Sequence, residues 1–133
     1  MQSENLSLMP TKLKVLLAED EPSMRRYIKT LMSRWDCDLA TEPTAEGAIQ
    51  QASTFRPDVA LLGFTPGMDR AQAGIELLKV SPRTTVVLAV EPVPPHVLND
   101  LRARGYEFPT LAAPFNEEKL RAVCLSSSRP KVK

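Results

Sequence analysis

A continuous apolar segment in the middle of the chain, Val59 to Gly63, limits most strongly what these residues can fold into. It does not alternate between apolar and polar residues, and the turn-forming pair Pro66-Gly67 follows it closely. A strand of this kind is covered on both faces, which is typical of a parallel sheet with helices on either side. Ligands of such sheets bind beyond the carboxyl ends of the strands, where Gly63 offers no side chain.

The rest of the chain alternates between strand and helix patterns. Further strands are indicated at Lys14–Ala18, Cys37–Glu42, Thr85–Val90 and Phe108–Ala112. Apolar residues at helical spacing predict helices over about 22–35, 45–55, 71–80 and 96–104, and a last helix capped by Asn116. Short connections between these elements require parallel neighbours with helices on both faces. We therefore predict a doubly wound α/β fold of five parallel strands in the order 2-1-3-4-5.

Length and composition indicate one ordinary globular domain. The 133 residues are 43% hydrophobic and 25% charged, which suffices for one sizeable core. We divide the chain into a flexible leader (residues 1–12), one domain (residues 13–125) and a polar tail (residues 126–133). The net charge of +1 argues against a strong positive electrostatic field that would attract nucleic acid. The sequence has neither a signal-peptide pattern nor a run of about 18 apolar residues, so we expect a cytoplasmic protein.

Three segments resemble the receiver domains of bacterial two-component response regulators, and together they span most of residues 13–125. They are the strand and acidic cluster of Val15–Pro22, the strand and loop of Arg56–Asp69, and the pair Pro114-Phe115 after the last strand. The resemblance implies a flavodoxin-like receiver fold and a role in signalling rather than an enzyme activity. It also implies a cis peptide bond between Ala113 and Pro114.

The residues of the family's phosphorylation site are missing. In receivers an aspartate at the end of the third strand accepts a phosphoryl group, a Ser or Thr ends the fourth strand, and a Lys precedes the Pro-Phe pair. The matching positions here are Gly63, Val90 and Ala113, which supply no nucleophile, hydroxyl or cation. The aromatic residue of the family's last strand aligns with Thr110, with Phe108 nearby. The resemblance therefore implies a degenerate receiver without catalytic residues.

Glu19 and Asp20 are what remains of that site. Carboxylate oxygens suit Mg²⁺, but this ion demands octahedral geometry, and position 63 provides no third acid, so we expect weak binding and no other cofactor. The same acids also suit the start of the helix that follows at Pro22, and both interpretations remain open. Cys37 and Cys124 lack metal-ligand spacing, and we expect them to be reduced thiols.

A protein partner is the expected ligand. In this family the face formed by the fourth helix, the last strand and the last helix commonly binds a signalling protein or a second copy. Three prolines before the fourth helix each fix φ, which favours constitutive docking over switching. We expect a phosphorylation-independent protein–protein interaction module of a two-component or phosphorelay system. The resemblance places on its partner face Val93, Asn99, Arg102, Tyr106, Phe108 and Glu118.

Two alternatives remain open. One is an active phosphorelay receiver with an atypical acceptor such as Asp20; Asp58 lies at the wrong end of the strand, about 16 Å from Gly63. The other is a weak nucleic-acid binder, although the balanced net charge makes nucleic acid an unfavoured partner. Such a binder would use the basic tail together with the basic residues of the first helix and its end, Arg25, Arg26, Lys29 and Arg34.

Overall fold

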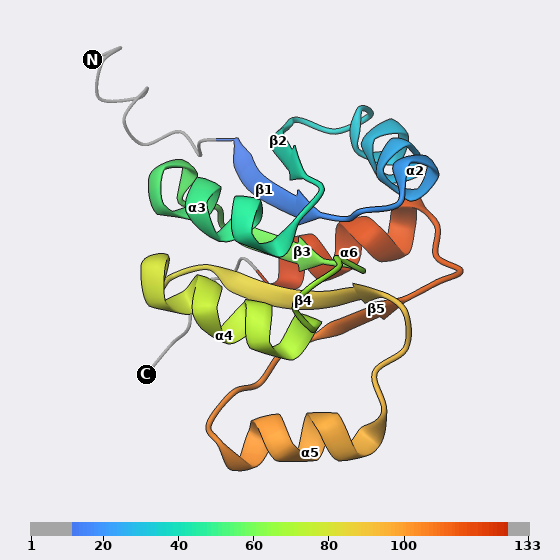
Figure 1. The fold of residues 1–133 in the computed structure, drawn as a ribbon. Coiled ribbons are helices and arrows are strands. Elements are labelled where there is room, and N and C mark those ends of the chain that lie inside the picture. Colours follow the sequence, from blue (N-terminus) through green and yellow to red (C-terminus); the bar gives the residue numbers. More distant parts are fainter. Residues whose placement is uncertain (1–11, 128–133) are drawn as a thin grey trace, which may run out of the picture.

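The structure, a computed structural model, describes residues 12–127 and contains a five-stranded parallel sheet in that range (Figure 1). The strand order is β2-β1-β3-β4-β5, as predicted. The strands are β1 Leu13–Ala18, β2 Cys37–Glu42, β3 Val59–Leu62, β4 Thr85–Val90 and β5 Thr110–Ala112. The described helices are α2 Pro22–Met32, α3 Ala45–Phe55, α4 Arg70–Val80, α5 Pro95–Ala103 and α6 Glu117–Ser127. Most of the expected leader and tail lies outside the described residues. None of the described helices is long and apolar enough to cross a membrane.

Two hydrophobic cores lie on opposite faces of the sheet. Helices α3, α4 and α5 cover one face, and α2 and α6 cover the other (Figure 1). Successive residues of β3 point to opposite faces, so Ala60 and Leu62 join the first core while Val59 and Leu61 join the second. All four are at most 2% exposed. This two-sided burial is the reason that the central strand has no alternating pattern.

Side-chain caps mark the starts of α3 and α6, and the cap of α6 is the one expected from the sequence. The hydroxyl of Thr44 accepts a hydrogen bond from the Gly47 N–H at 3.0 Å. The side chain of Asn116 accepts one from the Lys119 N–H at 2.9 Å. Each cap satisfies a backbone donor that has no partner within its helix. These local contacts fix where α3 and α6 begin, and hence the loops that precede them.

Two elements are shorter than the sequence predicts. Helix α2 ends at Met32 rather than at residue 35, and the chain continues in a tighter turn in which the Trp35 N–H donates to the Met32 carbonyl at 3.2 Å. Strand β5 begins at Thr110 rather than at Phe108. The intervening Pro109 accepts a bond from β4 through its carbonyl but has no N–H to donate. The fold is otherwise as expected, with boundaries shifted by a few residues.

Candidate functional site

The three positions that the resemblance matches to the receivers' phosphorylation site, Gly63, Val90 and Ala113, lie at one edge of the sheet. The Ala113 N–H donates to the Val90 carbonyl at 2.7 Å, and the Gly63 N–H donates to the Ala18 carbonyl at 2.8 Å. Strands β3 and β4 are neighbours, so the ends of four strands meet here, as predicted for a parallel sheet. We call this surface the carboxyl edge; it comprises the loops 19–21, 63–69, 91–94 and 113–116.

The carboxyl group of Glu19 fills the space that a side chain at residue 63 would occupy. A Cβ atom placed on Gly63 would lie 2.0 Å from Oε1 of Glu19 and 3.1 Å from its Cδ. Glu19 is only 1% exposed, which neither of the two interpretations of this acid, a weak Mg²⁺ ligand or an acid at a helix start, anticipated. Its Oε1 accepts from the Phe64 N–H at 3.2 Å, and its Oε2 accepts from the Glu21 N–H at 3.0 Å. The glycine therefore leaves no vacant pocket, because a neighbouring strand supplies the side chain.

Burial changes the acidity of this carboxyl group. Desolvation raises the pKa of Glu19 above its ordinary value, and the two backbone hydrogen bonds only partly oppose that rise. Asp20, by contrast, is exposed, and its N–H donates to the Phe64 carbonyl at 2.8 Å. Within residues 12–127, no group of three or more His, Cys, Asp or Glu side chains is arranged to hold a metal ion. Weak Mg²⁺ binding through Glu19 and Asp20 stays a prediction.

An arginine holds the backbone around Val90, the second of these positions. Val90 has φ of 79°, in the left-handed region that β-branched residues rarely adopt. The Nη1 atom of Arg70 donates to the carbonyls of Ala89 at 2.9 Å and Glu91 at 2.7 Å. Its Nη2 atom donates to the Pro92 carbonyl at 3.3 Å. A single side chain from the start of α4 thus ties down the loop between β4 and α5.

A tyrosine holds the loop at the third position. The bond between Ala113 and Pro114 is cis, as the resemblance implies. The Tyr27 hydroxyl, from α2, donates to the Phe115 carbonyl at 2.6 Å, and the two rings lie 5.8 Å apart between centroids. Sequence reasoning missed both Arg70 and Tyr27. No local pattern marks them, because their partners are 19 to 22 and 88 residues away in sequence.

The structure divides the residues expected on the partner face. Val93, Tyr106 and Phe108 are half-buried and pack against the first core. The Phe108 ring lies against α4, where a Cβ on Gly74 would be 3.0 Å from its Cε2 atom. The Tyr106 and Phe108 rings are 5.7 Å apart between centroids. These three side chains therefore contribute to the fold and offer only part of their surface to a partner.

The other three members of that face are exposed. Asn99 and Arg102 lie on α5, and the Asn99 Oδ1 atom accepts from Arg102 at 3.3 Å. Arg102 also pairs with Glu107 at 3.2 Å. Glu118 lies on α6. A partner can reach these polar groups without any rearrangement of the core.

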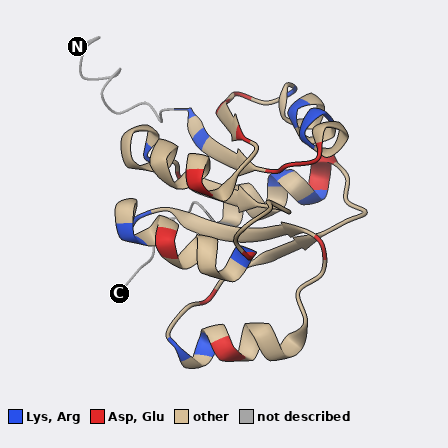
Figure 2. Ribbon diagram, in the orientation of Figure 1, with Lys and Arg blue, Asp and Glu red and all other residues tan. Residues whose placement is uncertain are grey.

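The basic residues of α2 are partly engaged within the molecule. In the ribbon of Figure 2, parts of α2 are coloured blue for Lys and Arg, and the segment before it is coloured red for Asp and Glu. Arg25 donates from Nη1 to the carbonyls of Glu19 at 2.9 Å and Asp20 at 3.1 Å. It therefore stabilises the carboxyl edge rather than standing free for nucleic acid.

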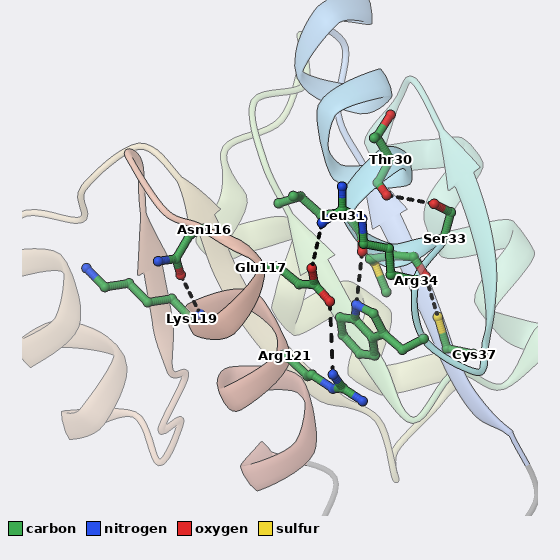
Figure 3. A network of polar contacts seen from close by, with 11 residues as sticks. Thr30, Leu31, Ser33, Arg34, Cys37, Asn116, Glu117, Lys119 and Arg121 are labelled. Carbon is green, nitrogen blue, oxygen red and sulfur yellow. Dashed lines mark hydrogen bonds and ion pairs between the residues drawn. The ribbon is translucent and has the colours of Figure 1, made fainter.

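A second basic residue joins the two helices on this face of the sheet. Arg34 pairs with Glu117 of α6 at 3.3 Å (Figure 3). Glu117 also lies 4.0 Å from Arg121, whose guanidinium lies 5.6 Å from the centroid of the Trp35 ring. The network connects the segment after α2 to α6. Of the four residues that a nucleic-acid site would use, two thus have partners within the protein.

Comparisons with known proteins identify the fold. No protein-family model matches the chain, and no curated protein is significantly similar in sequence. Solved structures do match. The signal receiver domain of an HD domain-containing protein from Pseudomonas fluorescens Pf-5 has a TM-score of 0.80 and 16% identity, over 90% of this chain and 89% of that one.

Two other solved structures agree. The chemotaxis response regulator CheY4 of Vibrio cholerae has a TM-score of 0.74 and 21% identity, over 88% of this chain and 99% of that one. A response regulator receiver domain protein from Clostridium thermocellum has a TM-score of 0.75 and 17% identity, over 87% of this chain and 94% of that one. Similarity at this level of identity establishes architecture, and on that basis the chain has the fold of response-regulator receiver domains.

Proposed function

We propose that the chain is a degenerate receiver of a bacterial two-component or phosphorelay system, which binds protein partners in the cytoplasm without being phosphorylated. The receiver fold supports the signalling class. One observation carries the rest: the Glu19 carboxyl group lies where a side chain at residue 63 would be. Phosphoryl transfer to this position lacks both a nucleophile on Gly63 and the space for the incoming group.

The loops of the carboxyl edge support a single conformation. Glu19 binds the backbone of Phe64, Arg70 binds three carbonyls of the β4–α5 loop, and Tyr27 binds the loop after β5. A ligand shifts a conformational equilibrium only if two states are accessible and differ in their affinity for it. Because each loop is bonded to another element, we infer constitutive docking rather than a phosphorylation switch.

The face of α5, β5 and α6 is the surface we propose for partner binding. Its exposed polar residues are Asn99, Arg102 and Glu118. The half-buried Val93, Tyr106 and Phe108 pack against the first core and so attach this face to the rest of the domain. A partner would then be a signalling protein or a second copy.

Intact-mass spectrometry tests the proposal. After incubation with acetyl phosphate and Mg²⁺, the wild-type chain should show no added phosphoryl group, while a phosphorylatable receiver treated in parallel controls for the reagent. A stoichiometric adduct on the wild type would contradict the proposal. If that adduct disappears in Asp20→Asn, the acceptor is Asp20 and the chain is an active receiver with an atypical site.

A further inference from the structure

The aromatic ring of Phe64 extends into solvent from the centre of the carboxyl edge. It is 54% exposed, although only Gly63 separates it from a strand with no exposed residue. Its backbone is held on both sides, because its N–H donates to Glu19 at 3.2 Å and its carbonyl accepts from the Asp20 N–H at 2.8 Å. The ring therefore stands on a rigid base and loses little backbone freedom when a partner covers it.

A hollow of about 390 Å³ lies beside this ring. Its apolar lining comes from Phe64, Pro66 and Met68, and its rim includes Asp69, Arg70 and Glu91. An exposed aromatic side chain next to a hollow with apolar walls and a polar rim is the arrangement found at the centre of many protein interfaces. The loop bonded to Arg70 forms part of the wall, so the hollow is already shaped in the free protein.

The charges around the hollow are mainly negative. Asp20, Asp69 and Glu91 are exposed, and none of them forms an ion pair within residues 12–127. The guanidinium groups nearby, those of Arg25 and Arg70, are both bonded to backbone carbonyls. The Asp69 carboxylate also caps α4, since its Oδ1 atom accepts from the Gln72 N–H at 3.0 Å. The three carboxylates outnumber the two guanidinium groups, so this surface favours a cationic partner over an anionic one.

We propose that this surface, centred on Phe64, binds a short segment of another protein in which arginine or lysine side chains flank an apolar side chain. The apolar side chain would lie in the hollow against Phe64 and Met68, and the cations would pair with Asp20, Asp69 and Glu91. The proposal deepens the proposed function by adding a second partner surface, and it rests on that function only in taking the chain as an interaction module.

A peptide titration of the full chain tests this. The probe is a synthetic peptide of alternating arginine and leucine residues, and its control carries glutamate in place of each arginine. Binding should move the backbone amide signals of residues 64–69, 20 and 91 in the ¹⁵N-labelled protein, and affinity should fall as salt rises. No binding of the arginine peptide, equal binding of the glutamate peptide, or shifts confined to other surfaces would each overturn the proposal.

Matched variants locate the interaction. Phe64→Ala should weaken binding at least about tenfold, and Glu91→Gln should weaken it severalfold, because one removes the aromatic anchor and the other a free carboxylate. Val80→Ala removes another exposed apolar side chain and Asp38→Asn another exposed carboxylate, and both should change affinity less than about twofold. Equal losses in the control variants would refute the assignment.

Sedimentation of the chain alone tests whether this surface binds a second copy of the chain instead of another protein. If the wild type self-associates at the assay concentration and Phe64→Ala abolishes that association, the surface binds a second copy and the assignment to another protein is wrong. A concentration-independent monomer in both variants agrees with the proposal. Neither experiment uses acetyl phosphate, so the proposed absence of phosphorylation can fail while this inference holds, and the reverse is equally possible.

Discussion

Placing an aspartate at position 63 by Gly63→Asp should destabilise the protein by about 3 kcal/mol. The cause is the contact with Glu19, since a Cβ on residue 63 would lie 2.0 Å from its Oε1 atom. Backbone strain at residue 63 adds nothing to this cost, because Gly63 does not have a left-handed φ; the glycines that do are Gly67 and Gly105. The substitution that would repair a receiver by sequence thus conflicts with the structure of this one.

The magnitude follows from the two ways in which the contact can be relieved. If Glu19 moves away, the N–H groups of Phe64 and Glu21 each lose a partner, at about 1–2 kcal/mol for each partly buried donor. If it stays, two carboxyl groups come within about 4 Å, which costs about 4 kcal/mol when both are ionised at an effective dielectric constant of 20. The first route costs about 2–4 kcal/mol and the second about 4 kcal/mol, so the less costly first route sets the expected loss at about 3 kcal/mol. A loss of this size lowers Tm by about 10 °C in a domain of this length.

Urea unfolding followed by the fluorescence of Trp35, the one tryptophan, measures the effect. Gly63→Ala is the matched variant with the steric contact but without the second charge. In the Glu19→Ala variant the obstacle is gone, so adding Gly63→Asp should cost less than about 1 kcal/mol, a coupling energy of about 2 kcal/mol. The same cost with and without Glu19, or no cost at all, would show that Glu19 does not occupy this space.

Four further outcomes are expected. Burial raises the pKa of Glu19 above its unfolded value near 4.5, so the folded state holds the proton more tightly than the unfolded state does. The wild type should therefore lose stability relative to Glu19→Gln as pH rises from 4.5 through the folded pKa. A difference in unfolding free energy between the two proteins that stays constant with pH would contradict this. Val90→Gly should change the unfolding free energy by less than about 1 kcal/mol, because relief at φ 79° offsets lost packing, whereas Val87→Gly in the same strand should cost more than about 3 kcal/mol. Burial raises the pKa of the Cys124 thiol to about 12 and also raises that of Cys37, so the native protein should react slowly with a thiol reagent at pH 8 and release two equivalents only when unfolded. A few millimolar Mg²⁺ should move Tm by less than about 1 °C, and a larger rise in a thermal scan would reveal a stronger site than we expect.

The fold was predictable because its signals are local. The unbroken apolar run of β3 reflects burial on both faces, and the caps Thr44 and Asn116 bond to residues three positions away. The errors were also local in origin. The extent of α2 and β5 depended on a turn bond between Trp35 and Met32 and on a missing donor at Pro109, which apolar spacing alone does not report.

The sequence predicted where the carboxyl edge lies but not which side chains fill it. Gly63, Val90 and Ala113 follow strand-like segments, and parallel strands bring such positions together. The sequence also suggested an exposed role for Glu19, since acids at a helix start are usually solvated. Its burial could not be foreseen, because it depends on the missing side chain of Gly63, 44 positions later in the chain.

The sequence by itself therefore determined the order of the elements, the parallel sheet, and the absence of a nucleophile at the end of β3. The tertiary structure alone decided that Glu19 fills the place of that nucleophile, that Arg70 and Tyr27 hold the adjacent loops, and that Phe64 is left in solvent. The physical reason is the range of the interactions. Strand and helix patterns follow from neighbours within a few residues, whereas these contacts exist only after packing has brought distant segments within 2.6 to 3.3 Å.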